Sequence, residues 1–334
     1  VQPTRFEYSK TIEEAGGKVI NVFRPPKNDF ILPLQEIEPL LYQNVKAIFL
    51  CSPNDPTGSL DSRESVIPLL DMAVKFSISV FIDERYVEFT THPNEMLSTL
   101  DSYEKIFFLR CFKYFYGVED YNLSYLIGTS KGLNSIEQFR DAKLNRENLK
   151  VDSIVVQKIA NLVQNSYLQH SIRDFYRDQR KRLLDNFNIL FGFQAYKSET
   201  NFLLVDSEEL GLTSKEISAR LLEKKIKIRD CGSYAGLNEY YFRVAVKQWE
   251  KNSVLWDALY EMLNIGQMNP KGIKLINESM ASQDTVGLLT ECPYYPCHQG
   301  LEDCTFCFCP FYPCKDARSG GKFSDQKKKK KRVW

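Results

Sequence analysis

Three groups of polar residues in the first part of the chain each follow a short apolar run, and their side chains are of types that bind ligands. They are Ser52–Gly58 (SPNDPTG), Asp83–Tyr86 (DERY) and Arg110–Gly117 (RCFKYFYG). The carboxyl ends of parallel strands are where α/β proteins place their ligands. The spacing therefore predicts a ligand site at three strand ends, although each group taken alone also fits an ordinary turn.

The C-terminal part of the chain carries a second feature of chemical interest, a dense set of thiols. The motif C-P-aromatic-Y-P-C occurs twice around a C-x-x-C-x-C core, and the predicted metal ligands are Cys292, Cys297, His298, Cys304, Cys307, Cys309 and Cys314. In a reducing compartment such a cluster more often binds metal than forms disulfides. The set exceeds one tetrahedral site, so zinc, an iron–sulfur cluster or a redox pair stay open, with three disulfides as the alternative.

The strands and helices that must position the polar groups are predicted to form an α/β fold with a mostly parallel sheet. Short runs rich in β-branched and aromatic residues predict strands at 45–51, 78–82, 106–112 and 125–128. Between the first two strands, residues 62–75 have apolar positions at helical spacing. Continuous apolar strands alternating with amphipathic helices are typical of a mostly parallel sheet covered on both faces.

The periodicity changes after about residue 150. One long helix or two consecutive helices fit residues 153–191, and strands at 201–205, 226–231 and 241–246 with helices at 214–224 and 252–263 predict a small α+β layer. We expect a large domain (1–150), a connecting helix (151–195), a small domain (196–266), a linker (267–284), a cysteine-rich metal module (285–321) and a basic tail (322–334).

The composition excludes a wholly disordered, fibrous or collagen-like chain. Hydrophobic residues make up 43% of the 334 residues and charged residues 26%, which is enough apolar content for a sizeable core. The net charge is +1, but residues 327–332 supply six positive charges, so the other 328 residues sum to −5. No apolar run approaches the roughly 18 residues of a membrane helix. We therefore expect a cytoplasmic protein with neither nucleic acid nor a membrane as partner.

Taken together, in this order and spacing, the three polar groups resemble the motifs of the fold-type I pyridoxal-phosphate enzymes. The branch that contains threonine-phosphate decarboxylase and histidinol-phosphate aminotransferase carries N-P-N-N-P-T-G, D-E-A-Y and S-F-S-K-x-F-G-L-A-G-L-R. The resemblance spans residues 1–265, and Val1–Tyr8 is similar to the segment that begins the family's substrate-facing helix. It implies an aminotransferase-like large domain, a small α+β domain, pyridoxal phosphate as cofactor and a homodimer.

The resemblance also implies roles for individual residues. Asp83 matches the carboxylate that keeps the cofactor's ring nitrogen protonated, which the cofactor needs in order to act as an electron sink. Tyr86 and Asp55 match the residues that hydrogen-bond the cofactor's phenolic oxygen. Arg243 matches the arginine that binds the substrate carboxylate, and Arg229 matches a second basic residue directed toward the substrate.

Three positions depart from the family pattern. Aligned without gaps, the Schiff-base lysine position is Tyr114, and Lys113 lies one residue early. A tyrosine cannot form an imine with an aldehyde, so either Lys113 takes over through a shift of register or the covalent link is lost. The arginine that binds the cofactor phosphate corresponds to Asn122, and the family's asparagine is Asp55, which accepts hydrogen bonds but donates none.

A further departure is the start of the chain. The family places roughly a hundred residues before the point that matches Val1, among them the helix start whose backbone donors bind the cofactor phosphate. On the resemblance we expect an amino-terminally truncated member, whether the shortening arose at a gene boundary, by evolution or in the preparation of the chain.

The cysteine-rich segment resembles a module fused behind some threonine-phosphate decarboxylases. The resemblance thus implies decarboxylation of L-threonine O-3-phosphate or serine phosphate, which supplies aminopropanol or ethanolamine phosphate for the nucleotide loop of cobalamin. Two alternatives remain: a histidinol-phosphate-type aminotransferase, and a catalytically degenerate subunit that carries metal or binds a partner. The small-molecule partner would be a phosphorylated amino acid.

Overall fold

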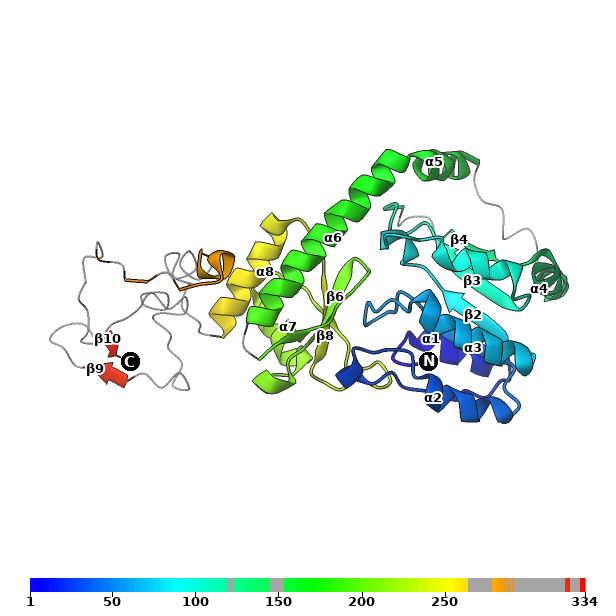
Figure 1. The fold of residues 1–334 in the computed structure, drawn as a ribbon, viewed down its shortest axis with the longest axis horizontal. Helices are drawn as coiled ribbons and strands as arrows, with labels where there is room; N and C mark the ends of the chain where they lie inside the picture. The colour runs from blue at the N-terminus through cyan, green and yellow to red at the C-terminus, as the bar shows by residue number, and fades with distance from the viewer. Residues whose placement is uncertain are drawn as a thin grey trace. The chain divides into compact units, whose positions relative to one another are not determined.

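The computed structural model describes residues 1–118, 123–143, 153–190, 192–263, 278–285, 287–288, 290, 322–324 and 331–333 (Figure 1). They fall into two compact units, 1–219 with 227–252 and 220–226 with 253–334. The α-helices are α1 (Phe6–Glu14), α2 (Leu34–Ile37), α3 (Arg63–Lys75), α4 (Ser130–Lys143), α5 (Ser153–Gln164), α6 (Ser166–Ile189), α7 (Ser214–Glu223) and α8 (Trp249–Met262). Short 3₁₀ helices lie at Pro26–Asn28, Glu38–Tyr42, Val87–Phe89, Glu95–Asp101 and Glu208–Leu210.

The first unit contains a four-stranded sheet in the order β1-β2-β3-β4. Its strands are β1 (Ala47–Cys51), β2 (Ser79–Asp83), β3 (Ile106–Cys111) and β4 (Ser124–Ile127). The first three are parallel, and β4 runs antiparallel at the edge beside β3. The predicted α/β fold with a mostly parallel sheet is confirmed, and the register pairs Cys51 with Asp83 and Asp83 with Leu109 at the carboxyl ends.

Side chains alternate between the two faces of this sheet, as the pleat requires. On one face, α3 contributes part of a hydrophobic core that includes the buried residues Ile48, Leu50, Val66, Leu69, Leu70, Ala73, Val80, Ile82, Ile106 and Phe108. On the other face, Phe49, Phe81 and Phe107 stack across three strands with ring centroids 5.1 and 5.0 Å apart. The ring centroids of Tyr8, in α1, and Phe49 are 6.0 Å apart, so α1 packs on this second face.

The long helical segment consists of two helices, α5 and α6, separated at Asn165. The Asn165 side chain accepts a hydrogen bond from the backbone N–H of Leu168 at 3.0 Å, which caps the start of α6. Along α6, Arg173 Nε donates to the backbone oxygen of Glu88, which follows β2, at 2.8 Å. Further along, Arg180 Nη1 donates at 3.0 Å to the backbone oxygen of Thr200, which lies in the loop before the strand Phe202–Asp206 of the second sheet. One helix is therefore hydrogen-bonded to connecting segments of both sheets.

The second sheet of this unit has the order β5-β6-β8-β7 and is antiparallel throughout. Its strands are β5 (Gln194–Ala195), β6 (Phe202–Asp206), β7 (Arg229–Asp230) and β8 (Tyr241–Ala245). All five residues of β6 are buried, as expected of a central strand. The three predicted strands are present, and β7 is shorter than the predicted run 226–231.

In the second unit, the Lys224 Nζ lies 2.7 Å from Glu261 Oε1. Two short strands, β9 (Lys322–Ser324) and β10 (Lys331–Val333), pair antiparallel within the predicted basic tail. The predicted metal ligands between 292 and 314 lie outside the described residues. Within the part of the chain that is described, no helix has both the length and the apolar character needed to cross a membrane.

Candidate active site

Asp83, the last residue of β2, is buried at the carboxyl end of the parallel sheet, with its side chain 3% exposed. The Arg85 Nε donates to both of its carboxylate oxygens, at 3.0 and 2.8 Å, and Arg85 Nη2 donates to Oδ2. The hydroxyl of Tyr8 also donates to Oδ2. Burial opposes the charge on Arg85, but the hydrogen bond and negative charge of Asp83 outweigh it and raise the pKa of Arg85.

A small cavity brings three of the predicted residues together. Asp83, Lys113 and Tyr114 line a space of about 230 Å³, which Arg5 and Arg85 also border. The Lys113 Nζ lies 5.8 Å from the centre of the Tyr114 ring. The amine therefore borders the same cavity as the carboxylate, one position before the place where the family pattern puts its lysine.

Tyr114 connects this cavity with the next group of residues. Its ring stacks on the ring of Tyr86, with centroids 4.8 Å apart and 23° between planes. Tyr86 is buried, and its hydroxyl donates to Asp55 Oδ2 at 3.5 Å. Burial and the negative charge of Asp55 raise the pKa of Tyr86, so the phenol stays protonated.

Asp55 is the centre of the second polar group, and its side chain is 3% exposed. Arg243 Nη1 donates to Oδ1, and the Tyr234 hydroxyl donates to the same oxygen at 3.3 Å. Arg5 Nη1 lies 4.0 Å from Oδ2. Burial opposes the charge on Arg243, but Asp55 outweighs it and raises the pKa of Arg243, while burial and Asp55 raise the pKa of Tyr234 to about 12.

The loop 52–58 holds Asp55 against the second sheet. Gly58 has a positive φ of 76°, a conformation that glycine adopts without strain. A Cβ at this position would lie 2.2 Å from Ser198 Oγ and 3.1 Å from Ser198 Cα. The backbone N–H of Glu199 donates to the Gly58 oxygen at 2.8 Å. This close approach explains the glycine and brings Asp55 within reach of β8.

The two predicted substrate-binding arginines lie side by side. Arg229 of β7 is directly opposite Arg243 of β8 in the antiparallel register, so both are on one face of the sheet. Arg229 is exposed, whereas the Arg243 side chain is 19% exposed, with its guanidinium 4.1 Å from the Phe202 ring centre. Like charges opposite each other are unfavourable, and Asp55 offsets this on the Arg243 side.

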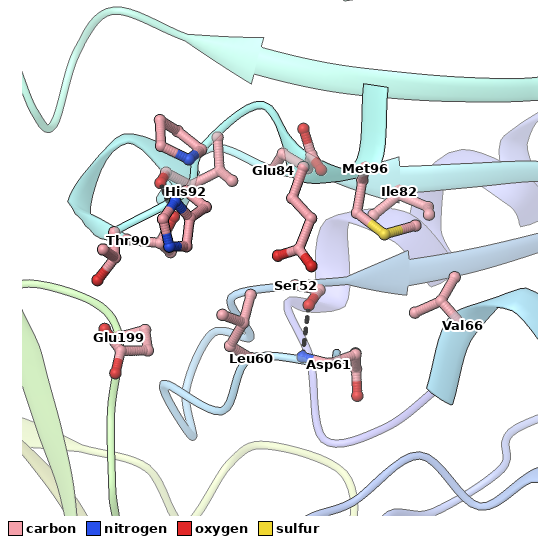
Figure 2. Close-up of a pocket in the computed structure, with 14 residues that line it drawn as sticks. Ser52, Leu60, Asp61, Val66, Ile82, Glu84, Thr90, His92, Met96 and Glu199 are labelled. Carbon is pink, nitrogen blue, oxygen red and sulfur yellow. Dashed lines mark hydrogen bonds between the residues drawn. The ribbon is translucent and has the colours of Figure 1, made fainter. Parts of the chain in front are cut away.

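Glu84 points away from Asp83, into a second cavity of about 220 Å³. Figure 2 shows its carboxyl group directed toward Ser52, with His92 at another edge of the cavity. Arg110 Nε donates to Glu84 Oε2 at 2.7 Å. Burial raises the pKa of Glu84 to about 7 against the opposing charge of Arg110. In the described parts of the chain, no group of three or more His, Cys, Asp or Glu is placed to bind a metal ion.

Four residues of this site were not found from the sequence. Arg85, Tyr8, Arg5 and Tyr234 all contact Asp83 or Asp55. Arg85 had a signal that could have been used, because a cation stands two residues after Asp83 where the family pattern has alanine. Tyr8 and Tyr234 are 75 and 179 positions from their partners, and no local pattern relates them. Asn122 lies outside the described residues, so its predicted role stays a prediction.

The described residues do not fit pyridoxal phosphate as its chemistry requires. An imine needs an amine, and Tyr114 offers a phenol at the position that matches the lysine. A carboxylate that stabilises a protonated ring nitrogen must be able to receive it, and both oxygens of Asp83 are already bound by Arg85. The fit therefore fails at the carboxylate and at the position that matches the lysine, although the neighbouring Lys113 borders the same cavity.

Comparison with known proteins gives relatives of two named activities. The chain is 28% identical over 267 residues to a histidinol-phosphate aminotransferase of Methanosphaera stadtmanae, covering 78% of this chain and 68% of the relative. It is 25% identical over 265 residues to threonine-phosphate decarboxylase of Salmonella typhimurium, covering 79% and 70%. The crystal structure of histidinol-phosphate aminotransferase from Clostridium acetobutylicum has a TM-score of 0.71 at 22% identity, covering 78% of this chain and 75% of that one.

Two family profiles match separate parts of the chain. Residues 284–334 match a family described as a cysteine-rich small domain, which contains the whole predicted set of metal ligands. Residues 2–259 match the family described as Aminotransferase class I and II, for which pyridoxal phosphate is the implied cofactor. The match covers most of the chain and includes all three polar groups with both sheets, so the chain belongs to the aminotransferase class I and II family.

Proposed function

We propose that this chain is a catalytically degenerate member of its family, derived from enzymes that act on phosphorylated amino acids and retained as a subunit that carries metal or binds a partner protein. The observation that carries the proposal is Tyr114, a phenol where the family pattern has its imine-forming lysine. The ring is built into the site, since it stacks on Tyr86 and borders the cavity of Asp83. The fold and the strand-end loops are kept while the reacting amine is displaced.

Borohydride reduction tests this proposal directly. The full chain is incubated with pyridoxal phosphate, reduced, digested and analysed by mass spectrometry for labelled lysines. We expect Lys113 to be labelled no more than exposed lysines such as Lys131, whose side chain is 79% exposed. Selective labelling of Lys113 would overturn the proposal.

The second candidate is decarboxylation of L-threonine O-3-phosphate or serine phosphate for the cobalamin nucleotide loop. It is favoured by the position of Lys113, which borders the cavity of Asp83, and by the similarity to threonine-phosphate decarboxylase. Release of carbon dioxide from threonine phosphate would support it. Formation of glutamate from 2-oxoglutarate would instead support the aminotransferase alternative suggested by the histidinol-phosphate relatives.

We propose that the cysteine-rich module, 285–321, binds zinc or an iron–sulfur cluster. Support comes from the six thiols and one imidazole, a donor set suited to either. Elemental analysis of protein purified without air separates the two metals, and disulfide mapping by mass spectrometry tests the alternative. A metal-free protein with three disulfides would refute metal binding.

We further propose a homodimer located in the cytoplasm and keep the predicted domain limits as part of the proposal. The dimer is suggested by the family resemblance, in which two subunits build one site. Light scattering after size-exclusion chromatography measures the mass against the 38.8 kDa of one chain. A monomer across the micromolar range would contradict this part of the proposal.

A further inference from the structure

Both carboxylates of the candidate site are neutralised by arginines of the same chain. Asp83 is bound by Arg85, two residues further along, and Asp55 is bound by Arg243, 188 residues further along. Both aspartate side chains are 3% exposed. Each carboxylate is therefore shielded from water and already has a counter-ion.

We propose that Arg85 and Asp55 are internal replacements for a ligand. The Arg85 guanidinium takes the place of a protonated ring nitrogen at Asp83, and the Asp55 carboxylate takes the place of a ligand carboxylate at Arg243. The inference rests on the proposed non-catalytic function and adds the residues that exclude cofactor and amino acid. The ion pairs Asp83–Arg85 and Asp55–Arg243 thus occupy the groups that would bind the cofactor and the amino acid.

The geometry at Asp83 leaves a ring nitrogen little to bind. A carboxylate has about four lone-pair positions, and Arg85 with Tyr8 supplies three hydrogen bonds to Oδ2 and two to Oδ1, one of these from the Arg85 backbone N–H. An approaching pyridinium would meet a neutral pair with the cation on its outer side. A nearby opposite charge changes a proton affinity by roughly 10- to 1000-fold, and Arg85 cancels that gain.

Hydrogen bonds within the segment 83–85 and to Tyr8 fix the Asp83–Arg85 pair, in addition to the attraction between the two charges. The backbone N–H of Arg85 donates to Asp83 Oδ1 at 3.0 Å, and the side chain returns to the same carboxylate. Arg85 Nη2 also donates to the Tyr8 hydroxyl at 3.2 Å, which fixes the outer end of the guanidinium. Arg85 already borders the cavity of about 230 Å³, so a shorter side chain at this position would enlarge that cavity.

The charge that an anionic ligand would use at Arg243 is neutralised in the same way. Its Nη1 donates to Asp55, its guanidinium carbon lies 4.1 Å from the centre of the Phe202 ring, and its Nε is buried without a hydrogen-bond partner. The hydroxyls of Tyr86 and Tyr234 also donate hydrogen bonds to Asp55. A ligand carboxylate would therefore meet a guanidinium whose charge Asp55 already neutralises, and to take the place of Asp55 at Nη1 it would have to displace an aspartate that also accepts from Tyr86 and Tyr234.

The test restores the amine and then varies the charge at position 85. Three variants of the full chain are compared: Tyr114→Lys alone, Tyr114→Lys with Arg85→Gln, and Tyr114→Lys with Arg85→Lys. The probe is pyridoxal phosphate, titrated by the visible absorbance of the imine and fixed with borohydride to locate the label. Arg85→Gln removes the charge, and Arg85→Lys is the matched control that keeps it.

We expect the Arg85→Gln combination to bind pyridoxal phosphate at least about 10-fold more tightly than Tyr114→Lys alone, and the Arg85→Lys combination to bind no more tightly. Equal affinity in all three variants, or an equal gain with Gln and Lys, would overturn the inference. Circular dichroism checks that each variant folds.

A second comparison applies if Tyr114→Lys does not fold. Arg85→Gln and Arg85→Lys are made with Tyr114 kept, and non-covalent binding is measured by quenching of protein fluorescence. Tighter binding by Arg85→Gln alone supports the inference, and equal binding overturns it. Labelling of Lys113 in the unaltered chain would overturn the proposed function without affecting this charge comparison.

Discussion

Replacing Asp55 by asparagine, the residue of the family motif, should destabilise this protein. Asp55→Asn removes the negative charge that neutralises Arg243, whose side chain is 19% exposed, and Arg229 lies opposite it in the register. Breaking a buried ion pair from one side costs about 3–5 kcal/mol. The partial exposure of Arg243 lets water solvate part of its charge, so we expect about 2–3 kcal/mol, less than the buried limit.

Arg243→Gln completes a double-mutant cycle. It leaves Asp55 buried, with the Tyr234 and Tyr86 hydroxyls still donating and Arg5 at 4.0 Å. We expect a loss of similar size, and a double variant that loses about 1–3 kcal/mol less than the sum of the two single losses. The coupling energy measures the pair itself, because the effects of each substitution that do not involve the other residue cancel in the cycle.

The assay is urea denaturation of the full chain followed by circular dichroism, with the slope of the transition compared between variants. Asp174→Asn is the matched control, because Asp174 pairs with Arg177 in an exposed position where both side chains are more than half exposed. This control should cost less than about 0.5 kcal/mol. Additive single losses, or losses no greater than the control, would refute the assignment of Asp55 as the counter-ion of Arg243.

Three further predictions concern groups outside this pair. Asp61→Asn should cost about 3–5 kcal/mol in the same denaturation assay, because it leaves the buried Arg24 without its ion-pair partner at 2.6 Å; a loss below about 1 kcal/mol would contradict this. Because burial raises the pKa of Glu84 to about 7, the folded state holds an extra proton between roughly pH 4.5 and 7. Its contribution to stability is therefore full at low pH and lost as the pH rises through about 7, and Glu84→Gln should flatten the stability profile between pH 5 and 8. Burial raises the pKa of the Cys51 thiol to about 11, so at pH 8 only about one thiol in a thousand is ionised and iodoacetamide should modify it far more slowly than the half-buried Cys111, as peptide mass mapping would reveal.

The elements of the fold could be predicted where side-chain pattern and burial agree. The run 45–51 became β1 because Ile48 and Leu50 pack against α3, and the helix predicted at 62–75 begins at Arg63 with Ser62 as its cap. The choice between one helix and two at 153–191 could have been settled by Asn165, a residue type that favours the first position of a helix. The helix α4 has a weakly apolar sequence, so periodicity gave no sign of it.

The candidate site could be predicted only in part. Motif spacing selected Asp83, Tyr86 and Asp55, which do lie at strand ends, but it could not reveal their partners. The partners of a buried charge are set by the fold, because two distant segments become neighbours only after the sheets form. Tyr8 reaches Asp83 through α1, and Tyr234 reaches Asp55 through the loop before β8, and neither contact has a local sequence signature.

The two charge pairs of the site differ in chain separation, and this has a consequence for the order of folding. Asp83 and Arg85 can pair as soon as the end of β2 forms, because closing so short a loop costs little entropy. Asp55 and Arg243 must bring together segments 188 residues apart, so their contact forms only when the second sheet docks on the loop 52–58. Substitutions at Asp55 should therefore accelerate unfolding and leave the refolding rate nearly unchanged, whereas the Asp83 pair is available early.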